Sequence, residues 1–134
     1  MALAKAKSWD TGTIAAGFLW DSPNPKANLL LQHGLGEYAE RFVWQYNQLI
    51  PKLVARGFNV YAIDLPGHGV AEIHSDEEVD PTSLASAIVE EVQKSHGIDE
   101  MHAAGNSLGG WIALEMGAVA PVKVKSITAL APAG

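Results

Sequence analysis

A serine flanked by glycines is the strongest chemical signal in this sequence. Residues 105–109 read GNSLG, which fits the pattern G-x-S-x-G around Ser107. Glycines two positions on either side let a strand and a helix pass closely without a Cβ clash, so the serine projects from a tight, strained turn. The residues before this pattern predict a strand over 101–106, and those after it predict a helix over 108–119. Because a nucleophilic serine requires that context, we interpret Ser107 as a nucleophile rather than an incidental serine in a glycine-rich turn.

A second candidate segment follows a short apolar run. Residues 29–37 read LLLQHGLGE, so a buried strand would lead into a glycine-containing loop. Such a loop aims backbone N–H groups at the oxyanion that develops during acyl transfer. The N–H groups of Leu35 and Leu108 would form the donor pair. His33 is either a general base or a side chain that packs and hydrogen-bonds to hold the loop, and we favour the second interpretation.

The elements that must position these residues alternate along the chain. Apolar runs predict strands over 13–20, 27–32, 58–64, 101–106 and 122–130, and helical spacing predicts helices over 40–56, 81–96 and 108–119. Pro51 predicts a kink or two short helices within 40–56. Asp80 and Pro81 are the expected start of the next helix, and Gly97 its end. Strands that alternate with helices predict an α/β fold, in which a mostly parallel sheet of about five strands carries helices on both faces.

Together these segments resemble the α/β-hydrolase family of serine esterases. HGLGEYAERF at 33–42 is most similar to its monoacylglycerol lipase arm, and GNSLGGWIALE at 105–115 is similar to bacterial esterases. The resemblance runs from about residue 12 to 134 and implies hydrolysis of small acyl esters without a cofactor. It also implies Ser107 as nucleophile, with Leu35 and Leu108 as oxyanion donors. The chain departs from the family just after Gly69, where the family often has a serine within Gly-His-Gly-x-Ser and this chain has Val70 and Ala71.

The family places an acid and then a histidine after the nucleophile. The 27 residues after Ser107 contain no histidine and no aspartate, and Glu115 lies within the predicted helix. We therefore expect residues 1–134 to form a single partial hydrolase core that lacks the lid and the C-terminal strands. Its activity would be weak or absent unless His33 or His68 serves as a substitute base. The alternatives are a non-catalytic scaffold or binding module, and a fragment that needs a second chain.

The predicted strand over 124–130 would be an exposed sheet edge. An unpaired apolar edge is a template for another chain, so we expect a homodimer or a partner chain there. The composition argues against other classes of partner. The sequence has 15 acidic and 9 basic residues, a net charge of −6 and no cysteine, which disfavours nucleic acid and excludes disulfides and thiolate metal sites.

Three further expectations concern location and metals. No apolar run reaches membrane-spanning length, and the first ten residues lack the apolar stretch of a signal peptide, so a cytoplasmic protein is expected. The acidic segment 72–80 matches no ligand template and is interpreted as a solvated loop rather than a metal site. The sharp loop over 64–69 is expected to shape the floor of a crevice.

Overall fold

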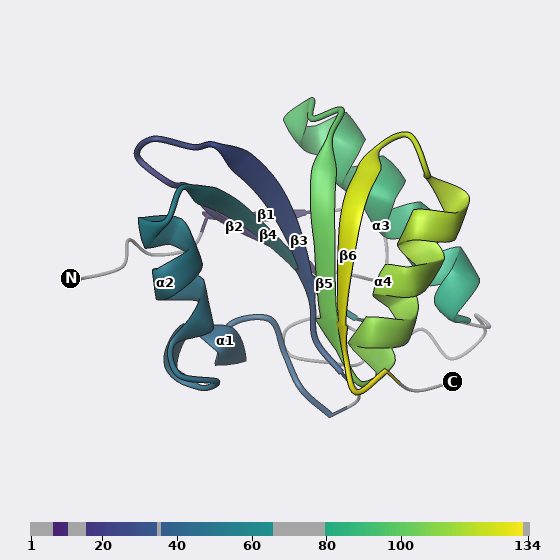
Figure 1. Cartoon of the computed structure of the whole chain (residues 1–134), viewed down its shortest axis with the longest axis horizontal. Helices are drawn as coiled ribbons and strands as arrows, with labels where there is room; N and C mark the ends of the chain where they lie inside the picture. The colour runs from purple at the N-terminus through teal and green to yellow at the C-terminus, as the bar shows by residue number, and fades with distance from the viewer. Residues whose placement is uncertain (1–6, 11–15, 35, 66–79, 133–134) are drawn as a thin grey trace.

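A computed structural model of the chain describes residues 7–10, 16–34, 36–65 and 80–132. It contains one six-stranded sheet with the strand order β1-β2-β4-β3-β5-β6 (Figure 1). The strands are β1 (Lys7–Asp10), β2 (Ala16–Trp20), β3 (Ala27–Gln32), β4 (Phe58–Asp64), β5 (Met101–Asn106) and β6 (Val124–Leu130). The four strands β4, β3, β5 and β6 are parallel, whereas β1 and β2 are antiparallel to their neighbours. The sheet is therefore mostly parallel, as predicted.

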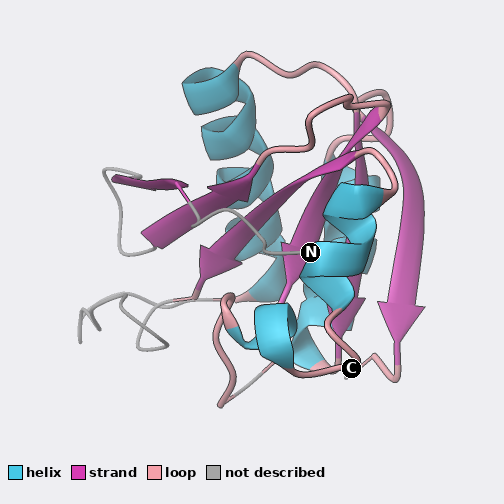
Figure 2. Ribbon diagram, turned by 90° about the vertical axis from the view of Figure 1, so that its left-hand side faces the viewer, coloured by secondary structure: helices cyan, strands magenta, loops and turns pink. Residues whose placement is uncertain are grey.

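Among the described residues, four helices cover the two faces of this sheet. They are α1 (Arg41–Trp44), α2 (Leu49–Ala55), α3 (Pro81–His96) and α4 (Leu108–Val119). Helices α1 and α2 lie on one face, and α3 and α4 lie on the other (Figures 1 and 2). Each face has its own core. The larger cluster includes Tyr61, Val92, Ile112 and Met116, and the other includes Trp20, Phe42, Ile50 and Val60. This arrangement confirms the predicted α/β class with helices on both faces.

The predicted helix over 40–56 is two short helices, but its break lies before Pro51. Tyr46, Asn47 and Gln48 all have positive φ angles, between 53° and 57°, and they separate α1 from α2. Pro51 is the third residue of α2. An N–H in the first turn of a helix has no partner within the helix, so proline costs little at this position. The helix is therefore interrupted at residues 46–48, whose positive φ angles make them a left-handed segment, and not at the proline.

Helix α3 begins and ends at the residues that the sequence predicted. The Asp80 carboxylate accepts a hydrogen bond from the Ser83 N–H at 2.8 Å, and Pro81 is the first helical residue. Gly97 follows the helix with a φ of 65°, and its N–H donates to the carbonyl of Gln93 at 2.8 Å. Both ends therefore satisfy backbone groups that the helix itself leaves unpaired.

Two strands differ from the sequence-based expectation. β1 was not predicted, because its four residues show no apolar pattern, and it forms by pairing antiparallel to β2. The apolar run over 101–106 suggested a buried strand, but in β5 only the alternate residues Met101, Ala103 and Gly105 are buried. These residues lie on the side of α3 and α4. The opposite side of β5 is only partly covered, so the strand has the alternating burial of a half-covered sheet.

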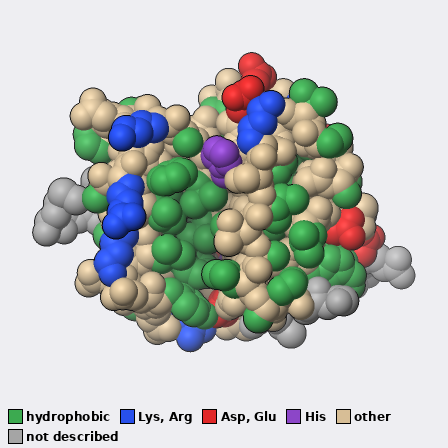
Figure 3. All heavy atoms as spheres, in the orientation of Figure 1, with side chains coloured by type: hydrophobic (Ala, Val, Ile, Leu, Met, Phe, Trp, Pro, Cys, Tyr) green, Lys and Arg blue, Asp and Glu red, His purple; other side chains and the backbone are tan. Residues whose placement is uncertain are grey.

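Strand β6 lies at one end of the sheet, where the sequence predicted an exposed edge. It pairs with β5, and most of its residues are exposed, including Ile127 and Leu130. Figure 3 shows hydrophobic side chains gathered in a hollow in the middle of the molecule, between α2 and β6. The edge position of β6 agrees with the prediction, and the second chain expected to bind there remains a prediction.

Within the part of the chain that the structure describes, the helices are too short or too polar to cross a membrane.

The stability of this fold is expected to fall as the pH decreases through the ordinary range of histidine. His96 ends α3 and packs against Tyr61, with ring centroids 5.0 Å apart. Burial lowers the pKa of His96 and outweighs the nearby charges of Asp21 and Glu91, which raise it. A histidine with a lowered folded-state pKa contributes stability above its unfolded pKa of about 6.5, and that stability is lost as the pH falls through the folded pKa.

Urea denaturation of wild type and His96→Gln between pH 8 and pH 5 checks this expectation. The free energy of unfolding of wild type should fall more steeply on acidification than that of the variant. Parallel pH profiles for the two proteins would contradict a lowered pKa for the half-buried imidazole of His96.

Candidate functional site

Ser107 occupies a strained turn between β5 and α4. Its φ and ψ angles are 57° and −119°, a conformation that residues other than glycine rarely adopt. The Ser107 N–H donates to the carbonyl of Leu130 at 2.9 Å, and the Ser107 carbonyl accepts from the N–H of Gly110 at 2.9 Å. The serine side chain makes no capping hydrogen bond to α4. The fold therefore holds the backbone of Ser107 from both sides and does not use its hydroxyl to cap the helix.

The flanking glycines allow this turn because neighbouring backbone fills the space of a side chain. A Cβ at Gly105 would lie 2.0 Å from the carbonyl oxygen of Gly109. A Cβ at Gly109 would lie 2.2 Å from the carbonyl oxygen of Gln32, at the end of β3. Both distances are far below ordinary contact, so no side chain fits at either position. The close approach of α4 to β3 brings the loop after β3 to the serine.

Gly34 is the residue of that loop that lies beside Ser107. A Cβ at Gly34 would be 2.8 Å from the carbonyl oxygen of Asn106 and 3.2 Å from the Cβ of Ser107. Leu108 begins α4 directly after the serine, where backbone N–H groups have no partner within the helix. The carboxyl ends of β3 and β5 and the N-terminus of α4 therefore meet at one place.

His33 is fully buried, and both of its ring nitrogens are hydrogen-bonded. Nε2 accepts from the N–H of Leu65 at 2.9 Å, and Nδ1 lies 2.8 Å from the carbonyl oxygen of Gly34. Because an N–H only donates and a carbonyl only accepts, the proton is on Nδ1 and the ring is neutral. His33 thus ties the loop after β3 to the residue that follows β4.

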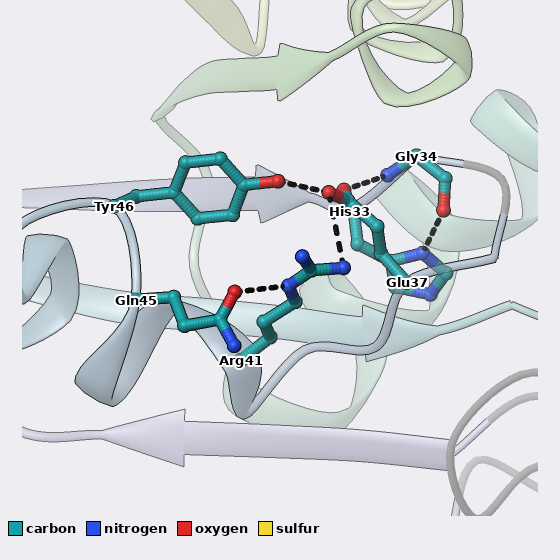
Figure 4. Close-up of polar contacts among 6 residues, drawn as sticks. All are labelled: His33, Gly34, Glu37, Arg41, Gln45 and Tyr46. Carbon is teal, nitrogen blue, oxygen red and sulfur yellow. Dashed lines mark hydrogen bonds and ion pairs between the residues drawn. The ribbon is translucent and has the colours of Figure 1, made fainter.

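Glu37 is the centre of a group of polar contacts next to Gly34 (Figure 4). Its Oε2 accepts from the N–H of Gly34 at 2.9 Å, and its Oε1 accepts from the hydroxyl of Tyr46. The Arg41 guanidinium lies 3.7 Å from Oε1 and also donates, through Nε, to Gln45 at 2.6 Å. Residues from the loop, from α1 and from the left-handed segment therefore converge on one carboxylate.

These contacts keep Glu37 ionised. Burial by itself raises the pKa of the Glu37 carboxyl, and the hydrogen bonds from Tyr46 and Gly34 act in the opposite direction. A side-chain hydrogen bond from Asn106 and the positive charge of Arg41 lower this pKa further, so the result lies below the ordinary value. The pKa of Tyr46 is raised, mainly by its hydrogen bond to Glu37 and to a smaller extent by burial.

The far end of the loop is fixed by a buried acid. Asp64, the last residue of β4, is 2% exposed, and its Oδ1 accepts from the N–H of Ala39 at 2.7 Å. The Gln32 side chain, also buried, donates to the carbonyl of Ile63 at 3.2 Å. The loop between β3 and α1 is therefore held to β4 as well as to the turn at Ser107.

The structure brings together three of the predicted site residues, namely Ser107, Leu108 and His33. Leu35 and His68 lie outside the described residues, as does most of the acidic segment 72–80. Among the described residues, no group of three or more histidine, aspartate or glutamate side chains is placed to hold a metal ion.

Sequence reasoning missed the roles of Glu37 and Asp64. Asp64 ends one predicted strand and Glu37 lies in the loop after another, and this position at the carboxyl edge of the sheet was the available signal.

Comparison with known proteins places this geometry in a family. Residues 27–133 match the family described as the alpha/beta hydrolase fold. Over 108 residues the chain is 31% identical to a dihydrolipoyllysine-residue acetyltransferase component of the acetoin cleaving system from Cupriavidus necator, covering 79% of this chain and 26% of that protein. Over 102 residues it is 35% identical to a pimeloyl-[acyl-carrier protein] methyl ester esterase from Methylococcus capsulatus. This match covers 76% of this chain and 35% of that protein.

A solved structure agrees with these relatives. The crystal structure of a predicted CIB-like hydrolase from Thermoplasma acidophilum matches with a TM-score of 0.80 and 25% identity, over all of this chain and 65% of that one. The chain spans about a quarter to a third of the length of the two curated relatives. Because the family match covers most of the sequence and agrees with the sheet order and the strained serine turn, the chain belongs to the alpha/beta hydrolase fold family.

Proposed function

We propose that this protein is a serine hydrolase that acts on carboxylic esters through Ser107. The observation that carries the proposal is the backbone of Ser107, which has a φ of 57° between β5 and α4 and lies against Gly34. A strained serine at the carboxyl edge of a parallel sheet is the arrangement of a nucleophile in this fold. The Methylococcus relative is named as a methyl ester esterase, which supports an ester as the substrate class.

In the proposed reaction the Ser107 hydroxyl attacks the ester carbonyl and loses its proton to a base. The tetrahedral oxyanion collapses, the alcohol leaves with a proton, and an acyl-serine ester remains. Water then cleaves this ester and releases the carboxylic acid. The N–H of Leu108, at the N-terminus of α4, and the N–H of Leu35 are the proposed donors to the oxyanion.

Two histidines, His33 and His68, are the candidates for the base of the proposed site. The acceptor nitrogen of His33 is occupied by the N–H of Leu65, which favours a loop-holding role over that of a base. His68 remains the other proposed substitute. For the 134-residue chain alone, we expect a rate enhancement of at most about 10³–10⁴-fold over the uncatalysed reaction in water. This is the enhancement that serine proteases retain without their triad.

Fluorophosphonate labelling of wild type and Ser107→Ala tests the proposal, together with turnover of p-nitrophenyl acetate. The expected result is labelling of wild type and its loss in Ser107→Ala. Ser126→Ala is a matched control, because the Ser126 hydroxyl lies 2.6 Å from Nδ1 of His102 and so belongs to a serine–histidine pair away from the proposed site. This control should be labelled like wild type.

Labelling that depends on Ser126 would contradict the assignment of Ser107. An unlabelled but folded wild type would contradict the enzyme proposal for this chain. It would favour the alternative of a non-catalytic scaffold or a fragment that needs a second chain at β6.

A further inference from the structure

We propose that Glu37 is a positioning residue for Ser107, and this inference rests on the function proposed above. Its carboxylate accepts a hydrogen bond from the Gly34 N–H in the loop after β3, and so it sets the place of the Gly34 backbone against the serine. The sequence-based interpretation assigned no role to this residue, whose hydrogen bonds and ion pair come from the loop after β3, from α1 and from the segment that follows α1.

The first step of the argument is the hydrogen bond to Gly34. The Gly34 N–H donates to Oε2 of Glu37 at 2.9 Å, and a bond from an amide to a carboxylate is stronger than one between neutral groups. Gly34 is also the loop residue that touches the Ser107 turn, since a Cβ there would lie 3.2 Å from the serine Cβ. Movement of this peptide would therefore change the surroundings of the hydroxyl directly.

The second step is that Glu37 is itself held from several directions. Tyr46 donates its hydroxyl to Oε1, and Arg41 lies 3.7 Å away while its Nε is fixed by Gln45 (Figure 4). Phe42 stacks on Tyr46 with ring centroids 4.9 Å apart, which connects the tyrosine to the core. A carboxylate held in this way is preorganised, so it can fix the loop without reorganisation during the reaction.

The third step is the absence of a reacting role for this carboxylate. Glu37 is ionised, so it is not a proton donor, and both of its carboxylate oxygens already accept hydrogen bonds, from Gly34 and Tyr46, so we assign it no role in proton transfer. A residue that orients the backbone next to the nucleophile, without touching the substrate, affects the rate by keeping the reacting geometry in place.

The experiment compares second-order rates of fluorophosphonate labelling for wild type, Glu37→Ala and Glu37→Gln. We expect Glu37→Ala to lower the rate by about tenfold or more, because a charge-assisted hydrogen bond at the site is lost. Glu37→Gln should recover most of the rate, because its amide oxygen still accepts from Gly34. Glu115→Gln is the matched control. Glu115 is a carboxylate in α4 that accepts from Trp111 at 3.4 Å, and its variant should react like wild type.

Amide hydrogen exchange at Gly34 gives a second readout that does not depend on activity. Its exchange should become about tenfold faster in Glu37→Ala and stay slow in Glu37→Gln. If Glu37→Ala does not fold, Tyr46→Phe takes its place, with an expected rate loss of about threefold. Equal labelling rates for wild type and the folded Glu37 or Tyr46 variants would overturn the positioning role alone. An unlabelled wild type would overturn the proposed function and this inference together.

Discussion

Replacing Gly109 with alanine is expected to destabilise the protein by about 3 kcal/mol or more, or to prevent folding. The new Cβ would lie 2.2 Å from the carbonyl oxygen of Gln32 and 2.6 Å from that of His33. Both obstacles are backbone atoms at the end of β3, which is paired on both sides by β4 and β5. No rotamer change relieves the contact, so α4 would have to move away from the sheet and take Ser107 with it.

Gly117→Ala, in the same helix, is the matched control. Its Cβ would lie 2.2 Å from Cδ1 of Ile127, but this atom ends a flexible side chain that is 37% exposed and can turn away. The gain in helix propensity from glycine to alanine is about 1 kcal/mol, so the control should be close to wild type in stability. Urea denaturation followed by circular dichroism measures both variants. Equal free energies of unfolding for Gly109→Ala and Gly117→Ala would contradict the close packing of α4 on β3.

Replacing His33 with alanine is expected to cost about 3–5 kcal/mol of stability. His33 is fully buried, and its removal leaves a cavity and an unpaired N–H at Leu65, while the Gly34 carbonyl keeps only its hydrogen bond from the Glu37 N–H. Each buried backbone group without a partner costs about 1–3 kcal/mol. His102→Ala is the control, because His102 is partly exposed and bonds to the side chain of Ser126, so its loss should cost about 1 kcal/mol or less.

The same pair of variants separates the two roles considered for His33. If His33 holds the loop, the His33→Ala variant should lose much of its stability whenever it loses labelling at Ser107. A His33→Ala protein with wild-type stability and no labelling would instead support the general base. Thermal or urea denaturation and fluorophosphonate labelling on the same samples decide between these roles.

Short-range patterns were sufficient to predict the elements that frame the site. The glycines at 105 and 109 and the apolar runs around them predict a strand, a turn and a helix without reference to the rest of the chain. The structure has these elements at 101–106 and 108–119. The ends of α3 were equally predictable, because Asp80 and Gly97 satisfy backbone groups within a few residues of themselves.

Other features depend on contacts that the local sequence does not contain. β1 has no apolar pattern and exists because β2 offers it an edge for pairing. The break between α1 and α2 falls at 46–48, where Tyr46 reaches Glu37 and stacks on Phe42, and not at the proline that marks the segment in the sequence. The half-covered state of β5 likewise follows from the packing of helices against one side of it.

The sequence by itself determined the fold class, the turn that presents Ser107, and the approximate bounds of the parallel strands and of α3 and α4. These features follow from the periodicity of apolar residues and from interactions between residues a few positions apart. The tertiary structure decided how the loop after β3 is held. Glu37, Asp64 and Leu65 fix that loop through hydrogen bonds, and those made by Asp64 and Leu65 join residues more than twenty positions apart. Such contacts depend on the strand order of the sheet, which brings the carboxyl ends of β3, β4 and β5 to one edge.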